Sequence, residues 1–208
     1  MAEKNEELEK IKTEIANCKK CSLWKYRKNP VPGEGNISAE VMFIGEAPGK
    51  SEDEQGRPFV GAAGKLLTQL INSIELSREE VYITNVLKCR PPNNRDPLLI
   101  EIEACTPYLN RQIAIIKPKI IMTLGNHSTK YILKKLKIQF RGITRARGKI
   151  YSGTISGVIV KVIPTFHPAA ALYNPRFKRY LEEDFMTLKK LLEGKIKQRG
   201  LFDFIKSF

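Results

Sequence analysis

The stretch Val41-Met42-Phe43-Ile44-Gly45-Glu46-Ala47-Pro48-Gly49 combines a short apolar run with a tight Gly- and Pro-containing loop. Such a run, bounded by turn residues, predicts a buried strand over residues 41–44 that ends in a loop. The same order recurs along the chain. Further apolar runs lie at residues 81–87, 119–124 and 158–163, and the last of them ends in Pro164-Thr165-Phe166-His167-Pro168.

Segments with helical periodicity separate these predicted strands. They cover residues 62–74, 98–116, 128–136 and 176–193, and residues 6–16 form a further short amphipathic helix. Residues 141–151 are basic and predict a surface loop leading to a strand. Strands that alternate with helices predict an α/β fold with a mostly parallel sheet covered on both faces. Ligands of such sheets bind beyond the carboxyl ends of the strands, so the loops after Ile44, Val86 and Ile163 should gather at one edge.

The charge of the chain bears on its partners. The 208 residues carry a formal net charge of +14. This excess favours a polyanionic partner such as DNA, because Lys and Arg replace the counterions around phosphates, although a merely basic soluble protein is the alternative. No apolar run is long enough to span a bilayer, and the charged segment 1–9 is not a secretory signal, so we expect a cytoplasmic protein with no membrane partner.

The four cysteines are Cys18, Cys21, Cys89 and Cys105. In a reducing compartment they are expected to bind metal rather than form disulfides. Two close and two distant cysteines suit one tetrathiolate site, and both Zn²⁺ and a four-iron cluster accept four thiolates. A redox dithiol at Cys18 and Cys21, or buried structural thiols, are the alternatives.

Polar and aromatic side chains follow the predicted strands. The loop from Gly45 to Gly49, with Glu52 shortly after it, offers backbone amides and a carboxylate to a neutral polar ligand and a water. Phe59, flanked by Gly and Pro, can stack on a base, and the amide of Asn85 can read a pyrimidine edge. His167 can donate a hydrogen bond to a leaving group. The alternatives are a plain turn for the loop, a core position for Phe59, a strand-end cap for Asn85 and a structural role for His167. His127 is expected to be a capping or surface residue.

Taken together, these residues resemble the family 4 uracil-DNA glycosylases. The likeness runs from about Cys18 to about Leu192. It implies a three-layer α/β/α sandwich around a short, mostly parallel four-stranded sheet, and a 4Fe-4S cluster on the four cysteines in place of zinc. The matching stretches are Gly45-Glu46-Ala47-Pro48-Gly49 with Glu52-Asp53, Gly56-Arg57-Pro58-Phe59-Val60-Gly61, Thr84-Asn85-Val86-Leu87-Lys88-Cys89-Arg90-Pro91 and Thr165-Phe166-His167-Pro168-Ala169-Ala170.

The resemblance also implies roles for the strand-end residues in hydrolysing the bond between uracil and deoxyribose, the first step of base-excision repair. Phe59 would stack on the flipped uracil, Asn85 would bond its polar edge, and His167 would support the departing anion. Three residues would line the uracil pocket, namely Gly45, Glu46 and Ala47. Glu46 would also orient the attacking water, and Glu52 would lie beside C5, where a thymine methyl would clash.

The expected substrate is uracil-containing DNA, single- or double-stranded. Family members often have a Leu soon after His-Pro-Ala-Ala, where a wedge replaces the flipped base, and here Leu172 follows Ala171. The basic residues expected near the same edge are Arg141, Arg145, Arg147, Arg176 and Lys178, of which Arg145, Arg147 and Arg176 are the predicted DNA contacts.

The chain is expected to have two parts: a catalytic domain over residues 1–195 and a C-terminal tail over residues 196–208. The tail stretch Gln198-Arg199-Gly200-Leu201-Phe202-Asp203-Phe204-Ile205 resembles a sliding-clamp-binding peptide. A tail that packs on its own domain is the alternative. Two other functions compete with uracil excision: a non-enzymatic zinc or iron–sulfur DNA-binding module, and a related glycosylase for another lesion.

Overall fold

The computed structural model describes residues 2–195. The predicted clamp-binding tail, residues 196–208, lies outside the described residues. A six-stranded sheet with the strand order β1-β3-β2-β4-β6-β5 forms the centre of the molecule. The strands are β1 (Glu34–Gly35), β2 (Val41–Gly45), β3 (Tyr82–Asn85), β4 (Ile120–Leu124), β5 (Tyr151–Ile155) and β6 (Val158–Thr165).

The predicted four-stranded sheet is therefore too small, although its four strands are present and parallel. Strands β3, β2, β4 and β6 run parallel to their neighbours, whereas β1 and β5 add antiparallel edges. Strand β1 has two residues, too few for a period-2 pattern. Strand β5 pairs with β6 through a tight hairpin in which Ser156 and Gly157 both have positive φ.

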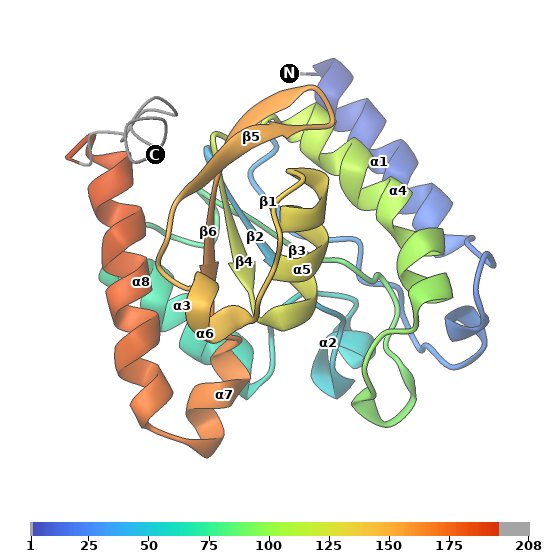
Figure 1. Cartoon of the computed structure of the whole chain (residues 1–208). Coiled ribbons are helices and arrows are strands. Elements are labelled where there is room, and N and C mark those ends of the chain that lie inside the picture. The colour runs from blue at the N-terminus through green and yellow to red at the C-terminus, as the bar shows by residue number, and fades with distance from the viewer. Residues whose placement is uncertain (1, 196–208) are drawn as a thin grey trace.

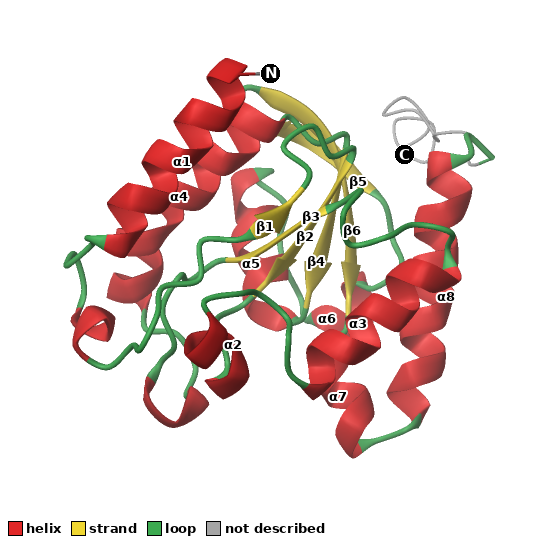
Figure 2. Cartoon of the chain, turned by 180° about the vertical axis from the view of Figure 1, so that it is seen from behind, coloured by secondary structure: helices red, strands yellow, loops and turns green. Residues whose placement is uncertain are grey.

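Helices cover both faces of the sheet, as Figures 1 and 2 show. The helices are α1 (Ala2–Ala16), α2 (Lys50–Gln55), α3 (Ala62–Ser73), α4 (Leu99–Ile116), α5 (Asn126–Lys135), α6 (Ile143–Ala146), α7 (Pro168–Tyr173) and α8 (Arg176–Leu192), with 3-10 turns at Ser22–Lys25 and Pro92–Asn94.

Alternate residues of each strand feed two separate hydrophobic clusters. Met42 and Ile44 pack with α1, α4 and α5, whereas Val41 and Phe43 pack with α3 and α8. Because a strand turns successive side chains to opposite faces, a buried five-residue run such as β2 serves both clusters. The three-layer α/β/α arrangement follows from this two-sided burial.

The carboxyl ends of the parallel strands meet at one end of the molecule. Strand β2 has β3 on one side and β4 on the other, so the chain changes direction across the sheet at β2. Helices α2 and α7, which follow β2 and β6, lie at this end in Figure 1. A crevice at such a point is where open α/β sheets bind ligands.

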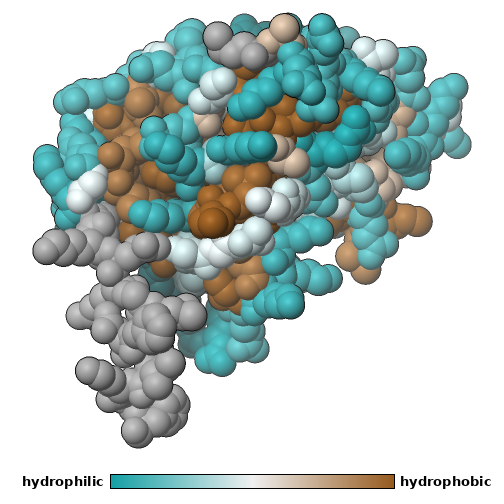
Figure 3. Space-filling model, turned by 90° about the horizontal axis from the view of Figure 1, so that it is seen from above, coloured by the Kyte–Doolittle hydropathy of each residue, from teal (hydrophilic) through white to brown (hydrophobic). Residues whose placement is uncertain are grey.

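The opposite end of the molecule has a mixed surface. Figure 3 shows apolar patches there that are separated by hydrophilic side chains. Within residues 2–195, no helix has both the length and the apolar character needed to cross a bilayer.

Candidate active site

A cavity of about 360 Å³ opens at the carboxyl ends of the strands. The loops after β2, β3 and β6 all contribute to its lining, as the position of their polar residues predicts. The predicted residues that line it are Glu46, Ala47, Glu52, Phe59, Asn85 and His167. Gly45 lies directly beneath: a Cβ there would come within 2.3 Å of the Asn85 Oδ1 atom and 2.6 Å of the Phe59 ring. Glycine is therefore required for the close approach of these two side chains.

Asn85 presents an unsatisfied acceptor to the cavity. The residue is 1% exposed, and its Oδ1 atom is a buried side-chain atom without a hydrogen-bond partner. A buried acceptor left unpaired costs about 1–3 kcal/mol, so such atoms in native proteins require an explanation. A ligand that brings an N–H group into the cavity would satisfy it.

The backbone of Asn85 is fixed from behind by a buried lysine. Lys88 Nζ donates hydrogen bonds to Asn85 O at 2.7 Å, Thr84 Oγ1 at 2.6 Å and Gln112 Oε1 at 2.8 Å. Burial lowers the pKa of Lys88 to about 7. Three acceptors around Nζ fix the backbone carbonyl at the end of β3 in place.

His167 stacks on Phe59 at the cavity wall, with ring centroids 5.6 Å apart and an interplanar angle of 30°. Burial lowers the pKa of His167 to about 4, so its imidazole is neutral at pH 7. Its Nδ1 atom accepts a hydrogen bond from the Ala169 amide at 3.2 Å and caps helix α7. Because Nδ1 is the acceptor, Nε2 carries the proton and acts as a donor.

Glu46 belongs to a group of three side chains. His127 Nε2 lies 3.8 Å from Glu46 Oε2 and 3.5 Å from Asp96 Oδ1. Burial raises the pKa of Glu46; the proximity of His127 opposes this rise, and Asp96 adds to it. The carboxylate of Glu46 therefore lies in the cavity with an imidazole beside it.

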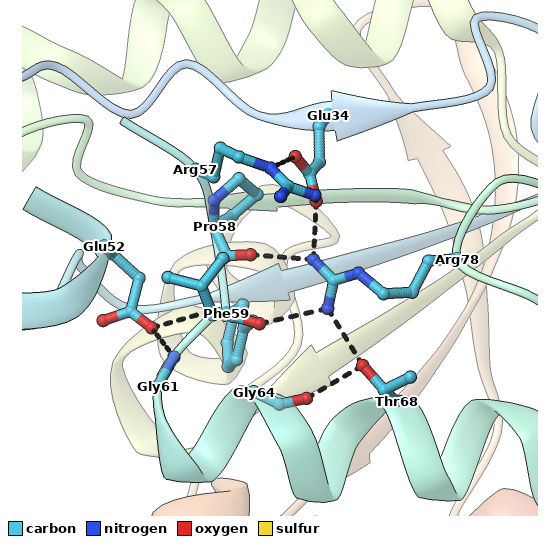
Figure 4. Close-up of polar contacts among 10 residues, drawn as sticks. Glu34, Glu52, Arg57, Pro58, Phe59, Gly61, Gly64, Thr68 and Arg78 are labelled. Carbon is cyan, nitrogen blue, oxygen red and sulfur yellow. Dashed lines mark hydrogen bonds and ion pairs between the residues drawn. The ribbon is translucent and has the colours of Figure 1, made fainter. Parts of the chain in front are cut away.

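Glu52 ties two loops together, as Figure 4 shows in part. Its Oε1 atom accepts hydrogen bonds from the amides of Val60 and Gly61 at 2.9 and 2.8 Å, and its Oε2 atom accepts one from Gly49 at 3.1 Å. The carboxylate is thus fixed at the wall of the cavity.

The predicted DNA-contacting residues fall into two groups. Leu172 is 50% exposed on α7, and Arg145 and Arg176 are also exposed. Arg147 differs: its guanidinium forms ion pairs with Asp184 at 2.8 Å and Glu183 at 3.1 Å, and its side chain is 18% exposed. Its Nε and Nη2 groups bind Asp184, Glu183 and the Tyr180 carbonyl of α8, and a DNA contact by Arg147 stays a prediction.

The four cysteines line a second, small cavity that shares no lining residue with the first. All four thiols are free. Arg27 Nη1 donates to Cys89 Sγ at 3.1 Å, and the Lys88 amide donates to Cys105 Sγ at 3.2 Å. Among the described residues, the cysteines do not include three whose sulfur atoms lie within 4.8 Å of one another. Donors aimed at the sulfurs suit thiolates that bind a metal centre.

The sequence interpretation did not include two residues that lie at or beside the candidate active site. His127, expected to be a capping or surface residue, faces Glu46, and Arg95 lines the cavity while its guanidinium pairs with Glu101 at 2.6 Å. His127 follows the carboxyl end of β4. The strand-end rule applied to the other loops would have placed it at the same edge.

Comparison with known proteins agrees with this geometry. A family model described as the Uracil DNA glycosylase superfamily matches residues 32–189. The chain is 60% identical over 189 residues to a type-4 uracil-DNA glycosylase of Saccharolobus solfataricus, an alignment that covers 90% of this chain and 88% of that protein. It is 62% identical over 185 residues to the type-4 uracil-DNA glycosylase of Sulfurisphaera tokodaii, with 88% and 84% covered. For that of Thermotoga maritima the identity is 41% over 195 residues, with 93% and 98% covered. The chain belongs to the type-4 uracil-DNA glycosylases, and the predicted family resemblance is confirmed.

Proposed function

We propose that this enzyme hydrolyses the N-glycosidic bond between uracil and deoxyribose in DNA and so initiates repair of deaminated cytosine. The buried, unpaired Asn85 Oδ1 atom carries the proposal, because Asn85 lines the same cavity as Phe59 and His167. The names of the relatives point to the same reaction. DNA as the substrate also favours a cytoplasmic location.

Base recognition combines stacking with edge reading. The ring of Phe59 supplies an apolar face for an everted pyrimidine. The Oδ1 atom of Asn85 would accept the N3–H of uracil, and its Nδ2 group would donate to O4. Cytosine carries an acceptor at N3 and a donor at C4, so the same amide orientation would reject it. Glu52, fixed at the cavity wall, would lie beside C5 and exclude a thymine methyl group.

Bond cleavage requires that negative charge be stabilised as it grows on uracil. The neutral His167 holds its proton on Nε2, since Nδ1 accepts from the Ala169 amide. This N–H group would donate to the O2 atom of the departing uracil. A preorganised donor of this kind lowers the barrier by about 3–4 kcal/mol.

A water must reach C1′ as the bond breaks. We assign its orientation to Glu46, whose carboxylate lines the cavity beside His127. The raised pKa of Glu46 suits a carboxylate that accepts a hydrogen bond from the attacking water. Gly45 and Ala47 complete the wall around it.

The nucleotide must first leave the helix of double-stranded DNA, at a cost of a few kcal/mol. We assign the wedge to Leu172 and phosphate contacts to Arg145 and Arg176, which are exposed near the cavity end of the molecule. The formal charge of +14 supports a polyanionic substrate. The sliding clamp as a partner of residues 196–208 remains a proposal from the sequence.

We infer that the four cysteines bind a 4Fe-4S cluster. Both Zn²⁺ and a four-iron cluster accept four thiolates. The likeness to the type-4 uracil-DNA glycosylases favours the cluster, and the donors to Cys89 and Cys105 suit bound thiolates. When bound, the cluster would join the N-terminal segment after α1 to the β3–α4 region. An iron and zinc count on the purified protein distinguishes the two metals.

Incubation with a uracil-containing single-stranded oligonucleotide, followed by alkaline cleavage of abasic sites, tests the proposal. We expect strand scission with the wild type. For Asn85→Ala we expect kcat/KM to fall about 10- to 100-fold, because the hydrogen bonds from Asn85 to the edge of uracil are lost. Asn17→Ala, at the end of α1, is the matched control. Binding without scission would identify a non-enzymatic DNA-binding module. Scission only at hypoxanthine or mismatched thymine would identify the related-lesion alternative.

A further inference from the structure

The loop of residues 58–61 carries Phe59 in an unfavourable backbone conformation. Phe59 has φ of 51°, in the left-handed region, yet its side chain is 6% exposed at the cavity wall. A bulky non-glycine residue adopts such a conformation only where the surroundings hold it there. The chain must therefore supply contacts that stabilise this loop.

Arg78 supplies contacts on the side of the loop away from Glu52, as Figure 4 shows. Its guanidinium donates to Pro58 O at 2.8 Å, to Phe59 O at 3.1 Å and to Thr68 Oγ1 at 3.3 Å. The side chain of Arg78 is 16% exposed, so solvent screens these bonds little. The planar fork of an arginine is suited to holding two adjacent carbonyl groups at once.

Glu34 on strand β1 fixes the guanidinium in turn. Arg78 Nη2 lies 2.7 Å from Glu34 Oε1, and Arg57 Nε lies 2.8 Å from Glu34 Oε2. Burial raises the pKa of Glu34, but the hydrogen bonds from Arg57 and Arg78 outweigh this effect and hold the pKa below its ordinary value. The antiparallel edge strand β1 thus orients Arg78 through a carboxylate.

The loop is therefore held from both sides. Arg78 binds the carbonyls of residues 58 and 59, and Glu52 binds the amides of residues 60 and 61. Gly64 leaves room for this arrangement, because a Cβ at that position would lie 1.9 Å from Phe59 O.

We propose that Arg78, oriented by Glu34, is a positioning residue that holds Phe59 ready to stack on the everted base. This inference rests on the proposed function. The positioning role predicts that loss of Arg78 weakens binding of the base but not of the DNA backbone, because Arg78 contacts the loop that carries Phe59.

The test compares Arg78→Met with Arg57→Met. Both variants remove an arginine from Glu34, but Arg57 is 59% exposed and its side-chain hydrogen bonds go to Glu34 alone. We expect Arg78→Met to weaken inhibition by free uracil about tenfold, the scale of one lost base–aromatic stack. Its affinity for DNA with an abasic site should stay within about twofold of wild type. Arg57→Met should leave both quantities unchanged.

A double-mutant cycle with Phe59→Ala shows whether Arg78 acts through the ring. In that background Arg78→Met should reduce kcat/KM by no more than about twofold, because coupled residues are not additive. Additive losses, or equal weakening of uracil and abasic-DNA binding, would overturn the proposal. If Arg78→Met fails to fold, Arg78→Lys decides: wild-type affinity for uracil contradicts the positioning role. A wild type that binds uracil without releasing it from DNA would instead contradict the proposed function.

Discussion

At the scale of single residues, the position of the proton on the His167 ring determines both its capping role and its proposed role as a donor. Its Nδ1 atom caps α7 by accepting from the Ala169 amide, and this leaves the proton on Nε2 for the leaving group. Burial lowers the pKa of His167 from 6.5 to about 4. The neutral imidazole is thus both a structural cap and the proposed donor.

This shift predicts a pH dependence of stability. The unfolded chain takes up a proton at His167 below pH 6.5, whereas the folded chain does so only near pH 4, so stability is full above pH 6.5 and falls between these values. At pH 5 the loss should be about 1–2 kcal/mol. His167→Asn keeps a capping acceptor without titrating. Urea unfolding at pH 7.5 and pH 5 should show a smaller drop for this variant. Equal drops would show that His167 is not buried in its neutral form.

At the scale of elements, the glycine at the end of β2 leaves room for the side chains of Asn85 and Phe59. A Cβ on Gly45 would collide with the Asn85 amide and the Phe59 ring, both side-chain groups. Backbone φ at this position is not in the left-handed region, so alanine is compatible with the strand itself. The glycine is therefore needed for the active site and not for the strand.

We predict that Gly45→Ala reduces kcat/KM on uracil-containing DNA by at least about tenfold, since both recognition groups must shift. Gly153→Ala on β5 is the control: the added Cβ would meet only the end of the Leu136 side chain, and neither residue lines the cavity. The thermal unfolding temperature of Gly45→Ala should stay close to that of wild type. A Gly45→Ala enzyme with full activity would mean that Asn85 and Phe59 need not adopt the arrangement in this structure.

At the scale of the whole molecule, basic residues lie at the same end as the cavity. Arg145 on α6 and Arg176 at the start of α8 are exposed there, as Figure 1 shows for the two helices. Lys119 directly precedes β4, so it lies at the other end of the strands, away from the cavity, where it pairs with Glu40 at 3.2 Å. We therefore expect Arg145 and Arg176 to contact phosphate and Lys119 not to do so.

The salt dependence of DNA binding tests this placement. We expect each of Arg145→Gln and Arg176→Gln to reduce the slope of log affinity against log salt by about 1, because each removes one phosphate contact. Lys119→Gln should leave the slope unchanged. Titrations of uracil-free single-stranded DNA at several salt concentrations measure it. An effect of Lys119 as large as that of either arginine would mean that DNA covers the other end.

Local patterns determined most of the architecture. The apolar runs and helical periodicity predicted the four parallel strands and the main helices close to their observed bounds, because burial on two faces leaves a pattern within each segment. The rule that ligands bind beyond the carboxyl ends of parallel strands also predicted that Glu46, Asn85 and His167 lie at one edge. These features depend on residues near one another in the chain.

Only the tertiary structure decided the contacts between distant segments. It added β1 and β5 to the sheet, and it paired Arg147 with Asp184 and Arg78 with the Phe59 loop. In the sequence, an arginine that contacts a phosphate cannot be distinguished from one that pairs with a buried carboxylate 37 residues away, as Arg147 does. Its partner depends on how the helices pack, and no local periodicity records that packing.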